Sequence, residues 1–536
     1  MMKLRNVWIL FICMLLLISM SACGTGFSGL VPDMLEKFEQ TEDEKGTQMT
    51  DLPSSAPAET EPEDSFDFAT YFPDVDPEGL EATEGLRYYS NGDGTCMVGC
   101  GNAEDRLIVI PEISPDGERV TGIRSRGFAD RTAPELIYIP AGVTLIDTEA
   151  FEECENLQYV YIPDSVREIR DMAFLHCASL KAIYIPDSAE SIGARVFSEC
   201  RDLHTVRLPE GLSAIGEDLF NHCVSLASIS LPDTLKSIGY NAFRGCESLT
   251  KIDIPDGVIS VGIGAFVGCP AIEVRDEISY VDTWAVDCKE RAVYVVIDEG
   301  TTGIATGIFD FCDRVQSVTL PSSLRYIGGS AFSGLTQLTG IEIPNGVEVI
   351  GGGAFAQCTK LTSVVLPDSV EVLGDGVFQN CTSLVEVKFP NHLTEIGQNM
   401  FSECTSLEQI TIPDGVTSIG RFAFYGCKAL KRVVLPDSVV SIGDQAFYFC
   451  SALSEVNIPD GVESIGGTAF NGCRSLTFIV IPKSVRTIGK NAFMDCTELV
   501  DFCYTGSREE WARIEMSRTD KWLDDVIISY DYVPRE

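Results

Sequence analysis

The side chains that could carry chemistry in this chain are 20 cysteines and four histidines. Fourteen of the cysteines recur in one register, with steps of 23 residues inside each block. They are Cys154, Cys177, Cys200, Cys223, Cys246, Cys269, Cys312, Cys358, Cys381, Cys404, Cys427, Cys450, Cys473 and Cys496. Regularly spaced thiols could pair as disulfides or hold a metal ion, so their chemistry depends on how the repeat places them.

In a stack of repeats, equivalent side chains lie about one strand spacing apart, roughly 5 Å. Parallel side chains seldom offer the Cβ directions that a disulfide needs, and ligands along one line cannot surround a metal ion tetrahedrally. Leu335 replaces one cysteine of the series, which a chain of bridges would not tolerate but a packed core would. We therefore expect a ladder of buried thiols, with no metal and no cofactor.

No pattern typical of an enzyme surrounds the histidines, which are His176, His204, His222 and His392. The chain has no H-E-x-x-H pair, no G-x-x-x-x-G-K-[ST] loop and no G-x-S-x-G elbow. Its 39 basic and 80 acidic residues give a net charge of −41, which disfavours nucleic acid and anionic lipid head groups as partners of the folded body. The sequence predicts no catalytic residues and a protein that is not an enzyme.

The N-terminal region has the form of a lipoprotein leader in residues 1–22. Basic residues precede an apolar run over residues 7–20, which is shorter than the roughly 20 residues of a transmembrane helix. Small residues come before Cys23, as in the bacterial lipobox, so we expect Cys23 to be lipidated; the alternative is an ordinary signal peptide with an incidental cysteine. Residues 23–84 are acidic and poor in aliphatic side chains, which predicts a disordered tether.

The elements that position these side chains follow from a repeat of 23 residues. A proline marks almost every repeat: Pro140, Pro163, Pro186, Pro209, Pro232, Pro255, Pro321, Pro344, Pro367, Pro390, Pro413, Pro436, Pro459 and Pro482. In the unit at Pro367, apolar residues alternate before the proline, which indicates a short strand that the proline ends. We expect a glycine turn and then a single helical turn that bears Phe378. Stacking of such units would bury the apolar residues of each repeat against its neighbours.

One unit, residues 407–427, reads L-E-Q-I-T-I-P-D-G-V-T-S-I-G-R-F-A-F-Y-G-C. This pattern resembles the bacterial leucine-rich repeats of the BspA-like and treponemal type, and the resemblance covers roughly residues 106–505. It implies an α/β leucine-rich-repeat solenoid, curved and elongated, with one short parallel strand and a short helical turn in each repeat. It also implies a cell-surface or secreted location, since members of this family are such proteins and are often implicated in adhesion.

The pattern divides the chain after the tether into five parts. They are an N-terminal cap with a degenerate first repeat (85–133), a first repeat block (134–277), a hairpin-like insertion (278–297), a second repeat block (298–499) and a C-terminal cap (500–536). Apolar runs on both sides of residues 287–291 predict the hairpin, either packed on the solenoid or projecting from it. A capping-box signal at Ser507 predicts a short helix, and residues 526–532 predict a strand. Cys96 and Cys100 flank a hairpin in the N-terminal cap and could form a local disulfide or stay as thiols.

Side chains two and four residues before each proline should face outward on the concave strands. In the first block they form a cluster of aromatic side chains with one arginine: Tyr138, Tyr159, Tyr161, Tyr184 and Arg207. Exposed tyrosine and arginine on adjacent strands have the composition of a binding hot spot, although β-strands favour tyrosine in any case. A second, partly apolar strip comprises Lys388, Arg432, Val434, Phe478 and Val480.

These features predict a lipid-anchored, extracytoplasmic protein of the bacterial cell surface that binds a protein or glycan through its strands, as adhesion proteins do. Only the N-terminal anchor would contact the membrane, and no nucleic acid is expected. The alternative is a structural spacer or self-association element of the cell envelope, which would tolerate surface changes but not loss of repeats.

Overall fold

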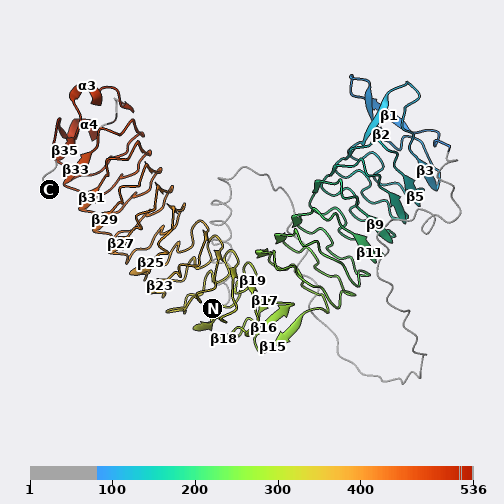
Figure 1. Ribbon diagram of the computed structural model, residues 1–536, viewed down its shortest axis with the longest axis horizontal. Helices are drawn as coiled ribbons and strands as arrows, with labels where there is room; N and C mark the ends of the chain where they lie inside the picture. Colours follow the sequence, from blue (N-terminus) through green and yellow to red (C-terminus); the bar gives the residue numbers. More distant parts are fainter. Residues whose placement is uncertain (1–80, 518–519, 521, 534–536) are drawn as a thin grey trace, which may run out of the picture. The chain divides into compact units, whose positions relative to one another are not determined.

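The computed structural model describes residues 81–517, 520 and 522–533 (Figure 1). The predicted signal peptide, the candidate lipidation site Cys23 and nearly all of the acidic tether lie outside the described residues. In the part of the chain that is described, no helix is both long and apolar enough to cross a membrane. This part is a stack of rungs, most of which have two short strands that pair with the strands of adjacent rungs (Figure 1).

The first strand of a rung lies directly before the repeat's proline, as predicted. This outward row comprises β3 (Leu107–Val109), β5 (Leu136–Tyr138), β7 (Tyr159–Tyr161), β9 (Ala182–Tyr184), β11 (Thr205–Arg207), β18 (Tyr294–Val296), β20 (Ser317–Thr319), β23 (Ser363–Val365), β25 (Glu386–Lys388), β27 (Gln409–Thr411), β29 (Arg432–Val434), β31 (Glu455–Asn457), β33 (Phe478–Ile481), β35 (Asp501–Tyr504) and β37 (Ile527–Ser529). Pairing is parallel and in register, and in strands such as β25 the middle residue is buried while its neighbours face solvent. The repeats at 228–230, 251–253 and 340–342 follow the same path without strand pairing.

A second, shorter strand follows each proline by five residues and was not predicted. This inner row comprises β4 (Arg119–Ile123), β6 (Leu145–Ile146), β8 (Glu168–Ile169), β10 (Ser191–Ile192), β12 (Ala214–Ile215), β13 (Ser237–Ile238), β14 (Ser260–Val261), β19 (Gly303–Ile304), β21 (Tyr326–Ile327), β22 (Val349–Ile350), β24 (Val372–Leu373), β26 (Glu395–Ile396), β28 (Ser418–Ile419), β30 (Ser441–Ile442), β32 (Ser464–Ile465), β34 (Thr487–Ile488) and β36 (Glu515–Met516). Its isoleucines point into the core, so the rungs are held together along two faces.

Glycine follows the inner strand because the rungs approach one another closely there. A Cβ atom on Gly443 would lie 2.8 Å from the backbone nitrogen of Arg421 and 2.8 Å from the carbonyl carbon of Gly420. Real Cβ atoms do not approach backbone this closely, so any larger residue would push the two rungs apart. Gly443 is therefore required by the packing of its own pair of rungs, although Asp147, Arg170 and Ala305 take the equivalent position elsewhere in the stack.

The predicted helical turn in each repeat is wrong. The segment that carries the phenylalanine is a series of tight turns in which Ala423 N–H donates to the carbonyl of Gly420 at 3.2 Å and Tyr425 N–H to that of Phe422 at 3.1 Å. Phe422 has a left-handed φ of 58°, which a right-handed helix cannot contain. Alternate N–H groups instead bond to the next rung, as Phe424 N–H does to the carbonyl of Ala446 at 2.8 Å. The helices described are α3 (Arg508–Trp511) and α4 (Trp522–Asp525), both in the C-terminal cap.

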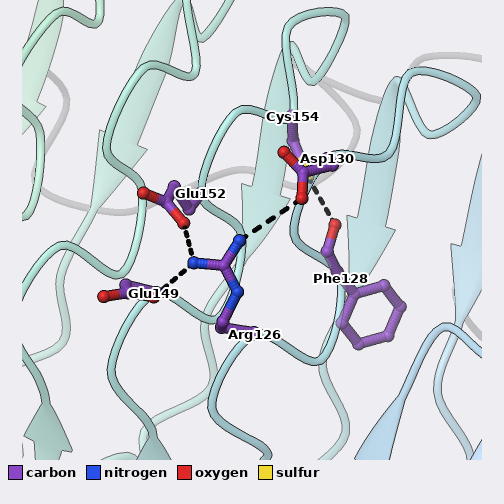
Figure 2. Close-up of polar contacts among 6 residues, drawn as sticks. All are labelled: Arg126, Phe128, Asp130, Glu149, Glu152 and Cys154. Carbon is purple, nitrogen blue, oxygen red and sulfur yellow. Dashed lines mark hydrogen bonds and ion pairs between the residues drawn. The ribbon is translucent and has the colours of Figure 1, made fainter.

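Stacked phenylalanine rings and a ladder of thiols fill the core. The rings of Phe424 and Phe447 lie 5.2 Å apart with an interplanar angle of 5°. Apart from Cys312, which donates to the carbonyls of Cys288 and Lys289, the ladder thiols donate to the phenylalanine carbonyl of the preceding rung, as Cys154 does to Phe128 at 3.0 Å (Figure 2). Burial raises the pKa of the Cys154 thiol to about 12. Beside this ladder the side chain of Arg126 bridges carboxylates of its own and the next rung (Figure 2).

The insertion is a meander built into the stack. β15 (Glu273–Arg275), β16 (Ile278–Val281) and β17 (Trp284–Cys288) are antiparallel, and β17 then pairs in parallel with β19. The predicted hairpin exists, but it turns between Val281 and Trp284 rather than at residues 287–291. The run predicted as its second arm is β18, the outward strand of the next rung. Trp284 is buried and stacks on Tyr326 at 6.1 Å, so the hairpin packs on the solenoid instead of projecting.

The caps largely follow the prediction. At the N-terminal end β1 (Arg87–Ser90) and β2 (Thr95–Gly99) form the expected hairpin, and Cys96 and Cys100 are buried free thiols. At the C-terminal end the predicted capping box is present: the Ser507 hydroxyl accepts from Glu510 N–H. The strand predicted over 526–532 is shorter and forms β37, which pairs with β35.

Candidate binding surface

The outward strands of the first block bring four of the predicted residues into one column. Tyr138 pairs in register with Tyr161, and Tyr184 with Arg207, each two residues before its proline. The rings of Tyr138 and Tyr161 stack at 5.0 Å with an interplanar angle of 5°. Strand pairing fixes this geometry, because parallel strands in register place like positions side by side. The column consists of the stacked pair Tyr138 and Tyr161 and, on the next two strands, Tyr184 and Arg207.

Tyr159, the fifth predicted residue, lies in the neighbouring column. It pairs with Ala182, four residues before the proline, and the Lys181 ammonium lies 5.8 Å from the centre of its ring. Lys181 also donates to Gln158 at 2.8 Å, and Gln158 to Glu135 at 3.3 Å. A row of linked polar groups thus runs beside the tyrosine column, as the polar rim of an interface does.

An acidic neighbour holds the arginine in place, and burial raises the pKa of the Tyr138 and Tyr161 phenols. Arg207 donates to Asp187 at 3.0 Å and to the carbonyl of Ile185 at 3.3 Å. The hydrogen bond from Arg207, with a backbone N–H bond, lowers the pKa of the Asp187 carboxyl, so the pair is ionised at neutral pH. Burial, and then the neighbouring Tyr138, raise the pKa of the Tyr161 phenol. The surface therefore offers flat rings, neutral hydroxyls and the cations of Arg207 and Lys181.

Two exposed side chains in an equivalent position were missed by the sequence reasoning. Tyr294 and Val296 on β18 are 70% and 63% exposed. They lie four and two residues before Asp298, which occupies the proline position of its repeat. The register could have revealed them, but their apolar alternation was interpreted as a hairpin arm. They belong to another sheet than the tyrosine column.

The second predicted strip also lies on outward strands. Lys388 is on β25, Arg432 and Val434 on β29, and Phe478 and Val480 on β33. Val434 and Phe478 are 49% and 39% exposed, but the five residues are spread over three sheets and do not form one cluster. Among the described residues no group of three metal-ligating side chains could hold an ion.

Comparison with known proteins places these features in a family. The model of the BspA-type leucine-rich repeat region matches this chain in six copies. The matched residues are 121–246, 213–290, 287–408 and 372–500. No curated protein matches the chain.

Solved structures of bacterial leucine-rich repeat proteins are similar to the chain. One from Bacteroides ovatus is 24% identical over 84% of this chain and 99% of its own, with a TM-score of 0.31. The leucine-rich repeat protein of T. pallidum is 32% identical over 35% of this chain and 90% of its own, with a TM-score of 0.34. A leucine-rich cell surface protein of Faecalibacterium prausnitzii is 24% identical over 81% of this chain and 97% of its own, with a TM-score of 0.28. Because the family model spans most of the rungs, the chain belongs to the BspA-type leucine-rich repeat family.

Proposed function

We propose that this protein is a non-catalytic binding protein of the bacterial cell surface, which captures a protein or glycan through the outward strands of its first repeat block. The observation that carries the proposal is the tyrosine column with its terminal arginine, Tyr138, Tyr161, Tyr184 and Arg207. Flat amphipathic rings on rigid strands supply contact area at low entropic cost, and arginine adds directional hydrogen bonds. Membership of the BspA-type family supports an interaction role.

The location is part of the same proposal. A related structure is described as a leucine-rich cell surface protein, which supports an extracytoplasmic location for this chain. The leader and Cys23 would supply a lipid anchor, so the folded body would meet its partner outside the membrane.

Binding of the protein to host or bacterial extracts immobilised on a surface tests the proposal. The full chain is compared with the triple variant Tyr138→Ala/Tyr161→Ala/Tyr184→Ala, and with Tyr294→Ala as a matched control on an outward strand of another sheet. We expect a partner that the wild type and the control capture equally and the triple variant loses at least tenfold, with circular dichroism unchanged. Equal capture by the triple variant would move the site elsewhere. If the wild type captures only its own copies, the protein is the envelope spacer or self-association element instead.

A further inference from the structure

A groove crosses the outward face where the strand row is broken. β20 and β23 are the last strands of two separate sheets, and residues 340–342 run between them without strand pairing. In the described part of the chain, no backbone hydrogen bond joins Gly340–Ile343 to either strand. The groove that results has a volume of about 650 Å³, which is within the usual range of ligand sites.

Gly340 lines the groove at a position where the backbone leaves room for a side chain. The equivalent positions of the flanking repeats, four residues before the proline, carry Ser317 and Ser363. Gly340 has no left-handed φ, so the backbone does not require glycine here, and a Cβ added to it would meet nothing within 4 Å. Close packing explains the glycines of the inner row, but it does not explain this one. Its effect is to remove a side chain from the wall of the groove.

The lining of the groove combines apolar side chains with the polar residues Thr319, Asn345 and Ser363 and a single charge. Leu320, Ile341 and Ile343 are half-buried and pack on the core, leaving part of their surface to the groove. Glu342 is the one charged residue among those that line it, and it is exposed. Among the described residues no lysine or arginine forms an ion pair with Glu342.

We propose that this groove receives a lysine or arginine side chain from an extended segment of a partner polypeptide. The aliphatic stem of such a side chain would lie along Ile341 and Ile343, and its cationic head would reach the carboxylate of Glu342. Long basic side chains are suited to this, because they bury an apolar stem while keeping the charge at the surface.

The site is separate from the tyrosine column. It uses the outward strands of the second block, and it stands whether or not the tyrosines bind the same partner. The chain's net charge of −41 would draw a basic segment toward it from a distance.

Fluorescence anisotropy with the full chain tests the proposal. The probe is the labelled, end-blocked peptide Leu-Lys-Val-Lys-Leu, with Leu-Glu-Val-Glu-Leu as the acidic counterpart. Gly340→Leu places a bulky side chain in the groove at a position where a Cβ meets nothing within 4 Å. Glu342→Gln removes the negative charge of the lining. Ser228→Leu is the matched control, because Ser228 is exposed at the same position of another repeat without a strand. Thermal melting checks that each variant folds.

We expect saturable binding of the basic peptide, at least tenfold weaker in Gly340→Leu, several-fold weaker in Glu342→Gln and unchanged in Ser228→Leu. The acidic peptide should bind at least tenfold more weakly. The tyrosine triple variant should bind the probe like the wild type, so that failure of this site and failure of the tyrosine site are distinguishable. The proposal is overturned if the basic peptide does not bind, if Gly340→Leu binds it normally, or if both peptides bind equally.

Discussion

Replacing one ladder cysteine by alanine should change the stability of the protein in a way that depends on pH. Cys358 is the clearest position, because its thiol is fully buried, donates to the carbonyl of Phe332 at 3.1 Å and has Leu335 as its neighbour in the preceding rung. Burial, partly offset by a backbone hydrogen bond, raises its pKa from the ordinary 9.0 to about 12. The folded protein therefore keeps this proton over a pH range in which the unfolded chain releases it.

The size and sign of the effect follow from these values. At pH 7 the Cys358→Ala variant loses the sulfur contacts and one hydrogen bond, which costs about 1–2 kcal/mol of unfolding free energy. The wild-type thiol contributes its full stability below pH 9, and this falls by about 1.4 kcal/mol per pH unit between the unfolded and folded pKa values. Alanine has no proton to lose, so the cost of the substitution should vanish near pH 10 and reverse above it, to the extent of a few kcal/mol at most.

Urea unfolding followed by circular dichroism at pH 7, 9, 10 and 10.5 measures this difference between the two full-length proteins. Leu335→Ala is the matched control, because it occupies the equivalent ladder position without a titratable group. Its cost should be about 2–4 kcal/mol and the same at every pH. A cost of Cys358→Ala that stays constant up to pH 10.5 would refute the account of the ladder as desolvated, protonated thiols.

Three further substitutions probe the repeat and the anchor. Gly443→Ala should lower the unfolding free energy by at least about 1 kcal/mol, because the added Cβ would clash with the preceding rung. The control is Gly211→Ala, whose Cβ meets nothing within 4 Å and which should stay within about 0.5 kcal/mol of wild type. Denaturant melts compare the two variants. Phe447→Ala should cost about 3–5 kcal/mol in the same assay, since the ring is fully buried between two others, and a smaller loss would mean that the rungs collapse around the hole. Cys23→Ser should abolish labelling of the protein by an alkynyl fatty acid in cells and release it to the medium; unchanged labelling would assign the lipid to another residue.

Much of the fold could be predicted from the sequence, because a strict repeat fixes register. The outward strands, the buried phenylalanines and thiols, and the Ser507 capping box all follow from residue type at fixed spacing. The helical turn could not be excluded in this way. Its left-handed positions carry residues such as His176, Phe422 and Phe449, which give no sign of a positive φ. Hydrogen bonds to the next rung make the left-handed conformation favourable, and the residue pattern of a single repeat does not reveal these bonds.

The candidate sites were predictable to a lesser degree, for a related reason. Side chains that hold the rungs together recur at every repeat, so their identity reports packing. Outward positions are exempt from that requirement, and they vary from Tyr161 to Ser230 to Lys388 along the row. An unusual residue at an outward position indicates a binding function only when the structure shows that packing does not require that residue. Gly340 passes this test and Gly443 does not. Binding sites on this solenoid should therefore be sought at outward positions where one repeat differs from the others and packing between rungs does not require the difference.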